Sequence, residues 1–150
     1  MLPKYSILVP VFNEEEVVEL FYETMTKTIR PLNEEYEIVF VNDGSKDKSL
    51  EILTSLAKKD SRVKVINFSR NFGQQAAELA ALSYAKGEAV IIMDVDLQDP
   101  PSVAIQMIEE WKKGFEVVHG KRKKRKGETI FKKFTAHCYY RFLRKITNMD

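Results

Sequence analysis

The sequence predicts an α/β protein built on a doubly wound, mostly parallel sheet, and three features carry this prediction. Several short apolar segments lack polar alternation, which is typical of strands that are covered on both faces. Longer segments with apolar residues at helical spacing lie between them, and parallel neighbouring strands need such helical crossovers. The length of 150 residues fits one domain with its own core.

Two strand–loop–helix units occupy the first part of the chain. Tyr5–Val11 is the first predicted strand, and Asn13 is expected to cap a helix that Pro31 ends. Tyr36–Asn42 is the second strand, and the turn Asp43–Ser45 leads into the second helix. The inner faces of the two helices are predicted to consist of Val17, Phe21, Met25 and Ile29, and of Leu50, Leu53 and Leu56.

The following segments repeat this alternation. Val63–Ser69 is a third strand, and the helix Gln74–Lys86 that follows it is expected to stop at Gly87 as a left-handed cap. Ala89–Met93 is the fourth strand. The remaining predicted elements are a helix that starts at Pro100 and Pro101 and runs to Gly114, and a short fifth strand, Phe115–His119.

Charge is distributed unevenly along the chain. The formal net charge is +2, but residues 1–118 carry 13 Lys and Arg against 20 Asp and Glu, whereas residues 119–150 carry 11 against two. We therefore divide the chain into a domain of residues 1–120 and a basic segment of residues 121–150. The single cysteine, Cys138, excludes an internal disulfide framework. No run of about 18 apolar residues occurs, so no membrane-spanning segment is predicted.

An acidic cluster follows the fourth strand directly. Asp94 and Asp96 are two residues apart, so an extended backbone presents both carboxylates on one side while Val95 turns to the core. Such a pair suits Mg²⁺ or Mn²⁺, which keep coordination positions for water and phosphate oxygens. A solvated strand end without a ligand is the alternative, but neighbouring carboxylates repel each other unless a cation lies between them. Because no glycine-rich phosphate-binding motif occurs, we expect a metal ion to hold the phosphates.

Two other acidic residues follow the first two strands. Asp43 ends the second strand, where it can accept a hydrogen bond from a base or a ribose, or form a turn or helix cap. Glu14 is either a ligand-binding residue or an ordinary residue of a first helical turn. A phospho-acceptor site of the response-regulator type is a competing interpretation, because Glu14, Glu15 and Lys121 loosely imitate its acidic pair and its lysine.

The last thirty residues have a different pattern. The basic run Lys121–Lys126 precedes Thr129–Ile146, where apolar residues recur at three- and four-residue steps among basic ones. An amphipathic helix of this type is typical of a membrane surface. No RNA-binding or recognition-helix pattern accompanies the basic run, so we expect no nucleic-acid partner. Without lipid, we expect the apolar face to pair with a second copy of the chain, forming a homo-oligomer, or to be disordered.

Four motifs along the chain resemble those of the family 2 glycosyltransferases. The similarity is greatest to the branch that moves a sugar from a nucleotide to polyprenyl phosphate, which includes dolichol-phosphate mannose synthases and bacterial undecaprenyl-phosphate glycosyltransferases. The motifs are Val9–Glu15, Val41–Ser49, Asn71–Gln74 and Met93–Pro101. They cover nearly the whole chain, and their combination is far more specific than any one of them.

The resemblance implies a Rossmann-like GT-A fold and a role for each matching residue. By this resemblance, the base and ribose pocket is lined by Pro10, Phe12, Glu14 and Asp43. The metal and the donor diphosphate are held by Asp94, Asp96 and Gln98, with Arg122 on the donor phosphates. Asp94, Asp96 and Arg122 are then the catalytic residues, and Thr129–Ile146 is similar to a first interfacial helix.

The function implied is inverting transfer of a sugar from a nucleotide-diphosphate sugar, with UDP favoured over GDP, to polyprenyl phosphate. An acceptor phosphate is largely ionised and needs no general base, whereas a sugar hydroxyl needs one, for which Asp99 is the nearest carboxylate. The alternatives are a transferase with a hydroxyl acceptor and a catalytically silent nucleotide- or membrane-binding module. Relatives continue beyond the last residue of this chain, so we expect a fragment of a protein at the cytoplasmic face of the membrane, and the fragment itself to be soluble in the cytoplasm.

Overall fold

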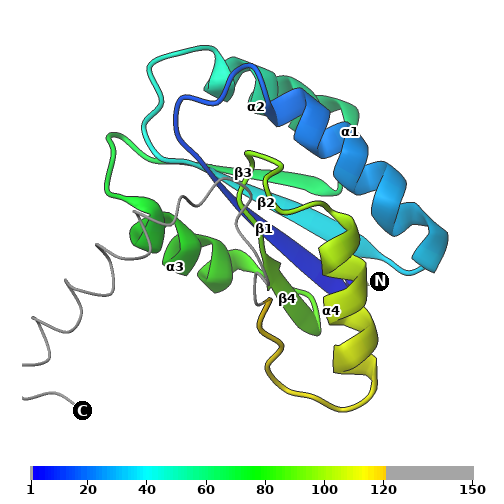
Figure 1. Ribbon diagram of the computed structural model, residues 1–150. Coiled ribbons are helices and arrows are strands. Elements are labelled where there is room, and N and C mark those ends of the chain that lie inside the picture. Colours follow the sequence, from blue (N-terminus) through cyan, green and yellow to red (C-terminus); the bar gives the residue numbers. More distant parts are fainter. Residues whose placement is uncertain (1, 121–150) are drawn as a thin grey trace, which may run out of the picture. The chain divides into compact units, whose positions relative to one another are not determined.

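Strands and helices alternate in the computed structural model, which describes residues 2–120 (Figure 1). The strands are β1 (Tyr5–Val11), β2 (Tyr36–Asn42), β3 (Val63–Asn67) and β4 (Ala89–Ile92). The helices are α1 (Val18–Ile29), α2 (Ser49–Lys59), α3 (Gln74–Tyr84) and α4 (Ser102–Lys112), with a 3-10 turn at Arg30–Leu32. The strand order is β3-β2-β1-β4 and every pairing is parallel, which confirms the predicted doubly wound α/β fold.

Helices cover both faces of the sheet. The larger core lies between one face and the three helices α1, α2 and α4, where Phe21 of α1 meets Phe40 of β2 edge to face. The smaller core lies on the other face, where Ala77 and Ala81 of α3 pack on Leu8 and its neighbours. Alanines at these two positions let α3 approach β1 and β2 closely. Consecutive residues of β1 therefore enter opposite cores, and both cores exclude water.

The start of α1 differs from the sequence prediction. Asn13 does not cap the helix, because its backbone is left-handed (φ 56°) and its side-chain oxygen accepts a hydrogen bond from the Lys46 backbone N–H. The helix begins only at Val18, which replaces Val17 as the first buried residue. The predicted inner positions Phe21, Met25, Ile29, Leu53 and Leu56 are buried, whereas Leu50 is only half-buried.

Gly87 has a different role from the predicted left-handed cap. The helix α3 ends at Tyr84, and the backbone of Gly87 does not have a positive φ. A Cβ atom at Gly87 would lie 2.5 Å from the backbone nitrogen of Ser6 and 2.8 Å from its Oγ. Glycine is therefore required because the α3–β4 connection passes directly against β1.

Polar contacts fix the amino ends of the strands. Ser6 donates to buried Glu37 (2.7 Å), whose Oε1 also accepts from the Lys86 backbone N–H, two residues after α3 (2.7 Å). At the same end of the strands, the Glu34 carboxylate accepts hydrogen bonds from the ammonium groups of Lys4 (2.6 Å) and Lys112 (2.7 Å). These contacts tie α3 and α4 to the two central strands.

The β4 side of the sheet is less covered than predicted within the described residues. Ile91 is buried, but Val90 and Ile92 are 40 % and 45 % exposed, because α3 packs over β1 and β2. The predicted fifth strand, Phe115–His119, is irregular, and Val117 is 71 % exposed. The physical reason is that a strand needs a hydrogen-bonding neighbour, and no described strand pairs with the outer edge of β4.

Stability should fall in acid through Asp60, which joins three elements at the end of α2. Its carboxylate accepts hydrogen bonds from the Arg62 guanidinium (2.8 Å), the Arg62 backbone N–H (3.0 Å) and the Tyr22 hydroxyl (2.8 Å). These bonds, chiefly those from the Arg62 side chain, lower the pKa of Asp60 from 3.8 to about 2. The stabilisation is therefore complete above pH 3.8 and is lost as the pH falls towards 2.

The variant Asp60→Asn should be less stable than the wild type at pH 7, with a difference that shrinks as the pH falls from 4 to 2. Thermal unfolding at several pH values measures this difference. Glu19→Gln, which changes an exposed carboxylate on α1, serves as the control and should leave the difference near zero. A gap between Asp60→Asn and wild type that is the same at pH 7 and pH 2 would contradict the assignment.

Candidate functional site

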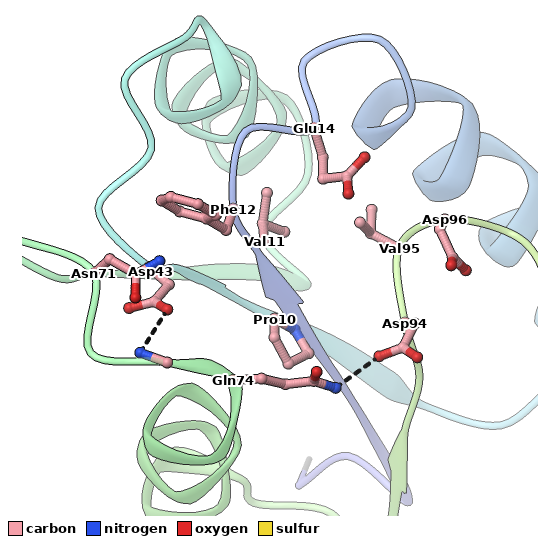
Figure 2. Close-up of a pocket in the computed structure, with 11 residues that line it drawn as sticks. Pro10, Val11, Phe12, Glu14, Asp43, Asn71, Gln74, Asp94, Val95 and Asp96 are labelled. Atoms are coloured by element: carbon pink, nitrogen blue, oxygen red, sulfur yellow. Dashed lines mark hydrogen bonds between the residues drawn. The ribbon is translucent and has the colours of Figure 1, made fainter. Parts of the chain in front are cut away.

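An open cavity of about 380 Å³ lies at the carboxyl ends of β1 and β2, beside the segment that follows β4 and the amino end of α3 (Figure 2). The strand order reverses between β1 and β4, and open α/β sheets bind ligands at such a reversal. The structure brings together six residues that were assigned from the sequence, namely Pro10, Phe12, Glu14, Asp43, Asp94 and Asp96. Its other lining residues are Val11, Asn71, Gly73, Gln74 and Val95.

Two loops join to form the wall that carries Phe12 and Glu14. The Asn13 backbone N–H donates to Ser45 Oγ (2.9 Å), and the Glu14 backbone N–H donates to Ser49 Oγ (2.9 Å). These bonds connect the loop after β1 to the turn after β2 and to the first residue of α2. Asn13 thus stabilises the loop by pairing with a neighbouring turn, which explains why the chain enters α1 four residues later than predicted. Phe12 is 43 % exposed at the rim of the cavity.

Asp43 is a buried carboxylate that clamps the β3–α3 loop. One oxygen accepts from the Phe72 backbone N–H (2.7 Å) and the other from the Gly73 backbone N–H (2.9 Å), and the residue is 3 % exposed. The next residue, Gly44, has φ 68° and lies so close to this loop that a Cβ would be 2.3 Å from the Arg70 carbonyl carbon. Asp43 does not cap α2; it holds a loop and lines the cavity (Figure 2).

Asp94 and Asp96 follow β4 as predicted, with Val95 between them turned into the core. Val95 is 4 % exposed, whereas both aspartates are exposed. Asp96 accepts a hydrogen bond from the Gln98 backbone N–H (3.0 Å) across Leu97, whose φ is 57°. This turn aims the chain away from the sheet, and Gln98 itself is exposed and is not among the lining residues.

The donor set of the cavity fits a divalent cation. Four carboxylates, those of Glu14, Asp43, Asp94 and Asp96, belong to its eleven lining residues, and none of the eleven is Lys, Arg or His. Within residues 2–120, no three acidic, His or Cys side chains are close enough to hold a metal by themselves. Mg²⁺ commonly binds through only one or two protein carboxylates, with water and phosphate oxygens completing its shell. Asp94 and Asp96 can supply those two carboxylates.

Gln74 is one of the five lining residues to which the sequence assigned no site role. Gln74 is the first residue of α3, and its Nε2 donates to Asp94 Oδ1 (3.0 Å) and to Glu78 Oε1 (3.0 Å). The motif Asn71–Gln74 does not predict this contact, because the bond joins the start of α3 to Asp94, which follows β4 twenty residues later. Its place at a helix start after a strand was the one available signal.

Arg122 and Thr129–Ile146 lie outside the described residues, so their assigned roles stay predictions. No helix in residues 2–120 is long and apolar enough to cross a membrane. Glu15, part of the competing phospho-acceptor interpretation, is outside the cavity lining, and its carboxylate accepts from the Lys48 backbone N–H (2.7 Å).

Comparison with known proteins gives consistent matches. The uncharacterized glycosyltransferase YkcC of Bacillus subtilis is 52% identical over 147 residues, covering 98% of this chain and 46% of that protein. The prophage bactoprenol glucosyl transferase homolog of Escherichia coli is 44% identical and covers 97% of this chain and 47% of that protein. The chain thus spans about half the length of these relatives. The crystal structure of S. aureus TarS 1–349 in complex with UDP-GlcNAc matches with a TM-score of 0.59 and 26% identity, over 81% of this chain and 38% of that one.

The sequence pattern of the family described as Glycosyl transferase family 2 matches residues 6–149, nearly the entire chain. The parallel sheet, its order and the cavity at its carboxyl ends agree with the GT-A architecture that the motifs imply. On sequence and fold together, this chain belongs to the family 2 glycosyltransferases.

Proposed function

We propose that this chain binds a UDP-sugar and that the protein transfers the sugar to a polyprenyl phosphate with inversion at the anomeric carbon. The observation that carries the proposal is the cavity of four carboxylates at the reversal of strand order. The 44% identity to the bactoprenol glucosyl transferase homolog supports the acceptor. The 26% identity to TarS, which was crystallised with UDP-GlcNAc, supports a uridine donor over a guanosine donor.

The nucleoside end of the donor is proposed to lie against β1 and β2. Phe12 offers a partly exposed ring and Pro10 an apolar floor, while buried Asp43 stands beside them. A carboxylate at a strand end can accept a hydrogen bond from a base N–H or a ribose hydroxyl. Each Asp43 oxygen accepts one backbone N–H bond and has a further lone pair with which it can accept another.

The diphosphate is proposed to lie near Asp94 and Asp96, where a cation must offset the carboxylate charge. A divalent ion held there by Asp94 and Asp96 would supply neutralising charge to the departing nucleoside diphosphate. Glu14 adds further negative charge to the wall and so favours cation binding. Arg122 is proposed to contact the donor phosphates as a second positive charge.

The attack by the acceptor requires a correctly oriented phosphate rather than a general base. An oxygen of the polyprenyl phosphate attacks the anomeric carbon as the bond from that carbon to the donor diphosphate breaks, which inverts the configuration. A phosphate monoester is already largely ionised at neutral pH, with a second pKa of about 6, so no side chain has to remove a proton. The chain must therefore exclude water and orient the two phosphates.

Membrane contact is proposed for the segment Thr129–Ile146 on the basis of its sequence. Phe131, Phe134 and Ile130 recur with basic residues between them, which favours binding to anionic lipid at about 1 kcal/mol for each Lys or Arg near the surface. Such contact would bring the cavity to an acceptor whose phosphate lies at the bilayer surface. Without lipid, the same apolar residues favour association of two copies.

A vesicle assay tests the proposed function. The protein is mixed with anionic vesicles that contain undecaprenyl phosphate, radiolabelled UDP-glucose or UDP-GlcNAc, and Mn²⁺. We expect label in the extracted lipid, none with undecaprenol in place of its phosphate, and loss of vesicle sedimentation and transfer at high salt. The matched variant Phe131→Glu with Phe134→Glu should sediment poorly while it still binds UDP.

Two results would contradict the proposal. Label transferred to a soluble saccharide but not to lipid would favour the alternative with a hydroxyl acceptor, for which Asp99 is the nearest candidate base. Nucleotide binding without any transfer by the protein and its full-length relatives would favour a silent binding module.

A further inference from the structure

Gln74 makes a contact that the donor pocket alone does not explain. It is the first residue of α3, and its side chain reaches past Pro10 towards the end of β4 (Figure 2). Its amide nitrogen donates to Asp94 Oδ1 (3.0 Å) and to Glu78 Oε1 (3.0 Å). A side-chain amide nitrogen carries two hydrogens, so these two bonds use both of them.

This pattern fixes the orientation of the amide. Two carboxylate acceptors can be satisfied only by the nitrogen, because the amide oxygen would repel either of them. Glu78 lies one turn along α3, so it holds the amide from its own helix while Asp94 receives the second N–H. One oxygen of Asp94 is thereby engaged, and the other remains available for a ligand.

The backbone beneath Gln74 is also held. Asp43 accepts from the N–H groups of Phe72 and Gly73, directly before Gln74. Further along α3, buried Ala77 and Ala81 pack on the sheet. The Gln74 side chain therefore extends from a held helix start to Asp94 Oδ1.

We propose that Gln74 is a positioning residue of the cation site, which holds Asp94 Oδ1 so that its Oδ2 faces the divalent ion. This inference rests on the proposed function, because it requires a cation at Asp94 and Asp96. Partners that hydrogen-bond a metal-binding carboxylate orient it and tune its affinity. The Gln74 amide nitrogen also donates to both Asp94 and Glu78, and so offsets the repulsion between two neighbouring carboxylates.

Direct measurement of Mn²⁺ binding tests this role. Free Mn²⁺ is followed by electron paramagnetic resonance, with and without UDP. Gln74→Ala is expected to weaken Mn²⁺ binding by about 10–100-fold, the usual cost of removing such a partner. Its melting temperature without ligand should stay near that of the wild type, because Gln74 is exposed. A purely structural role would instead lower the melting temperature.

Three further variants test whether the effect is specific to Gln74. Gln75→Ala removes the neighbouring exposed glutamine of α3 and should leave Mn²⁺ affinity unchanged. Glu78→Gln keeps an acceptor oxygen for the Gln74 amide and should retain most of the wild-type affinity, whereas Glu78→Ala should reduce it. Loss of affinity in Gln75→Ala as large as in Gln74→Ala would contradict a specific role.

The two levels of the proposal fail in different ways. A wild-type protein that binds no Mn²⁺, with or without UDP, would overturn the cation site itself and the inference with it. A wild-type protein that binds Mn²⁺ as tightly as Gln74→Ala does would leave the cation site in place and overturn only the role of Gln74.

Discussion

Replacing Asp96 with alanine should abolish the stabilisation that UDP gives this protein in the presence of Mn²⁺. For the wild type, saturating ligand should raise the free energy of unfolding by about 2.7 kcal/mol at a hundredfold excess over Kd. Asp96 is exposed, and its carboxylate accepts a local hydrogen bond from the Gln98 backbone N–H, so the ligand-free variant should melt close to the wild type. Thermal shift with UDP and Mn²⁺ measures both quantities.

A carboxylate at the opposite end of β4 provides the control. Glu88→Ala removes an exposed acidic side chain just before the strand and should leave the UDP-dependent shift intact. The wild-type shift should also disappear when EDTA removes the metal. Equal stabilisation by UDP in EDTA would show that the cavity binds nucleotide without a cation, and would overturn the role given to Asp94 and Asp96.

Gly44→Ala should destabilise this domain strongly, and more than the same substitution at Gly114. The residue has φ 68°, which costs a residue with a Cβ about 1–2 kcal/mol. The added Cβ would also lie 2.3 Å from the Arg70 carbonyl carbon and 2.5 Å from the Asn71 nitrogen, both of them backbone atoms. Forced overpacking adds about 1–3 kcal/mol, so we expect a total loss of about 2–5 kcal/mol in urea unfolding.

The damage should extend to the cavity, because the atoms that must move belong to the loop that Asp43 clamps. Gly114→Ala is the matched control: its φ is 101°, but a Cβ there meets nothing within 4 Å. It should carry the backbone cost of about 1–2 kcal/mol alone and leave UDP binding unchanged. Equal destabilisation by the two substitutions would mean that the contact with Arg70 and Asn71 relaxes freely.

The strands were the most predictable part of the fold. Tyr5–Val11 and Tyr36–Asn42 begin and end where the sequence predicts, because a centrally placed parallel strand is a nearly continuous apolar segment. The errors occurred where one segment depends on another that is distant in sequence. Asn13 pairs with the turn at Ser45 and Lys46, and Gly87 passes against Ser6. Local capping preferences cannot reveal either contact.

The candidate site divides in the same way. Asp94 and Asp96 could be placed from the sequence because a strand end and a spacing of two define their direction. The contacts of Asp43 and Gln74 could not, because both depend on how the β3–α3 loop meets strands β2 and β4. Gln98 was assigned to the metal from the sequence but is not among the residues that line the cavity. It follows Leu97, whose left-handed backbone changes the direction of the chain.

The polar contacts at the amino ends of the strands have a consequence for redesign of donor preference. At the amino ends of the strands, opposite the cavity, α3 and α4 are anchored by Ser6, Glu37 and Glu34. Register and helix placement therefore do not depend on the identity of rim residues such as Phe12 and Asn71. Phe12 is proposed to contact the base, so an engineer can vary this position to test acceptance of a different base while the contacts at the amino ends of the strands keep the scaffold folded.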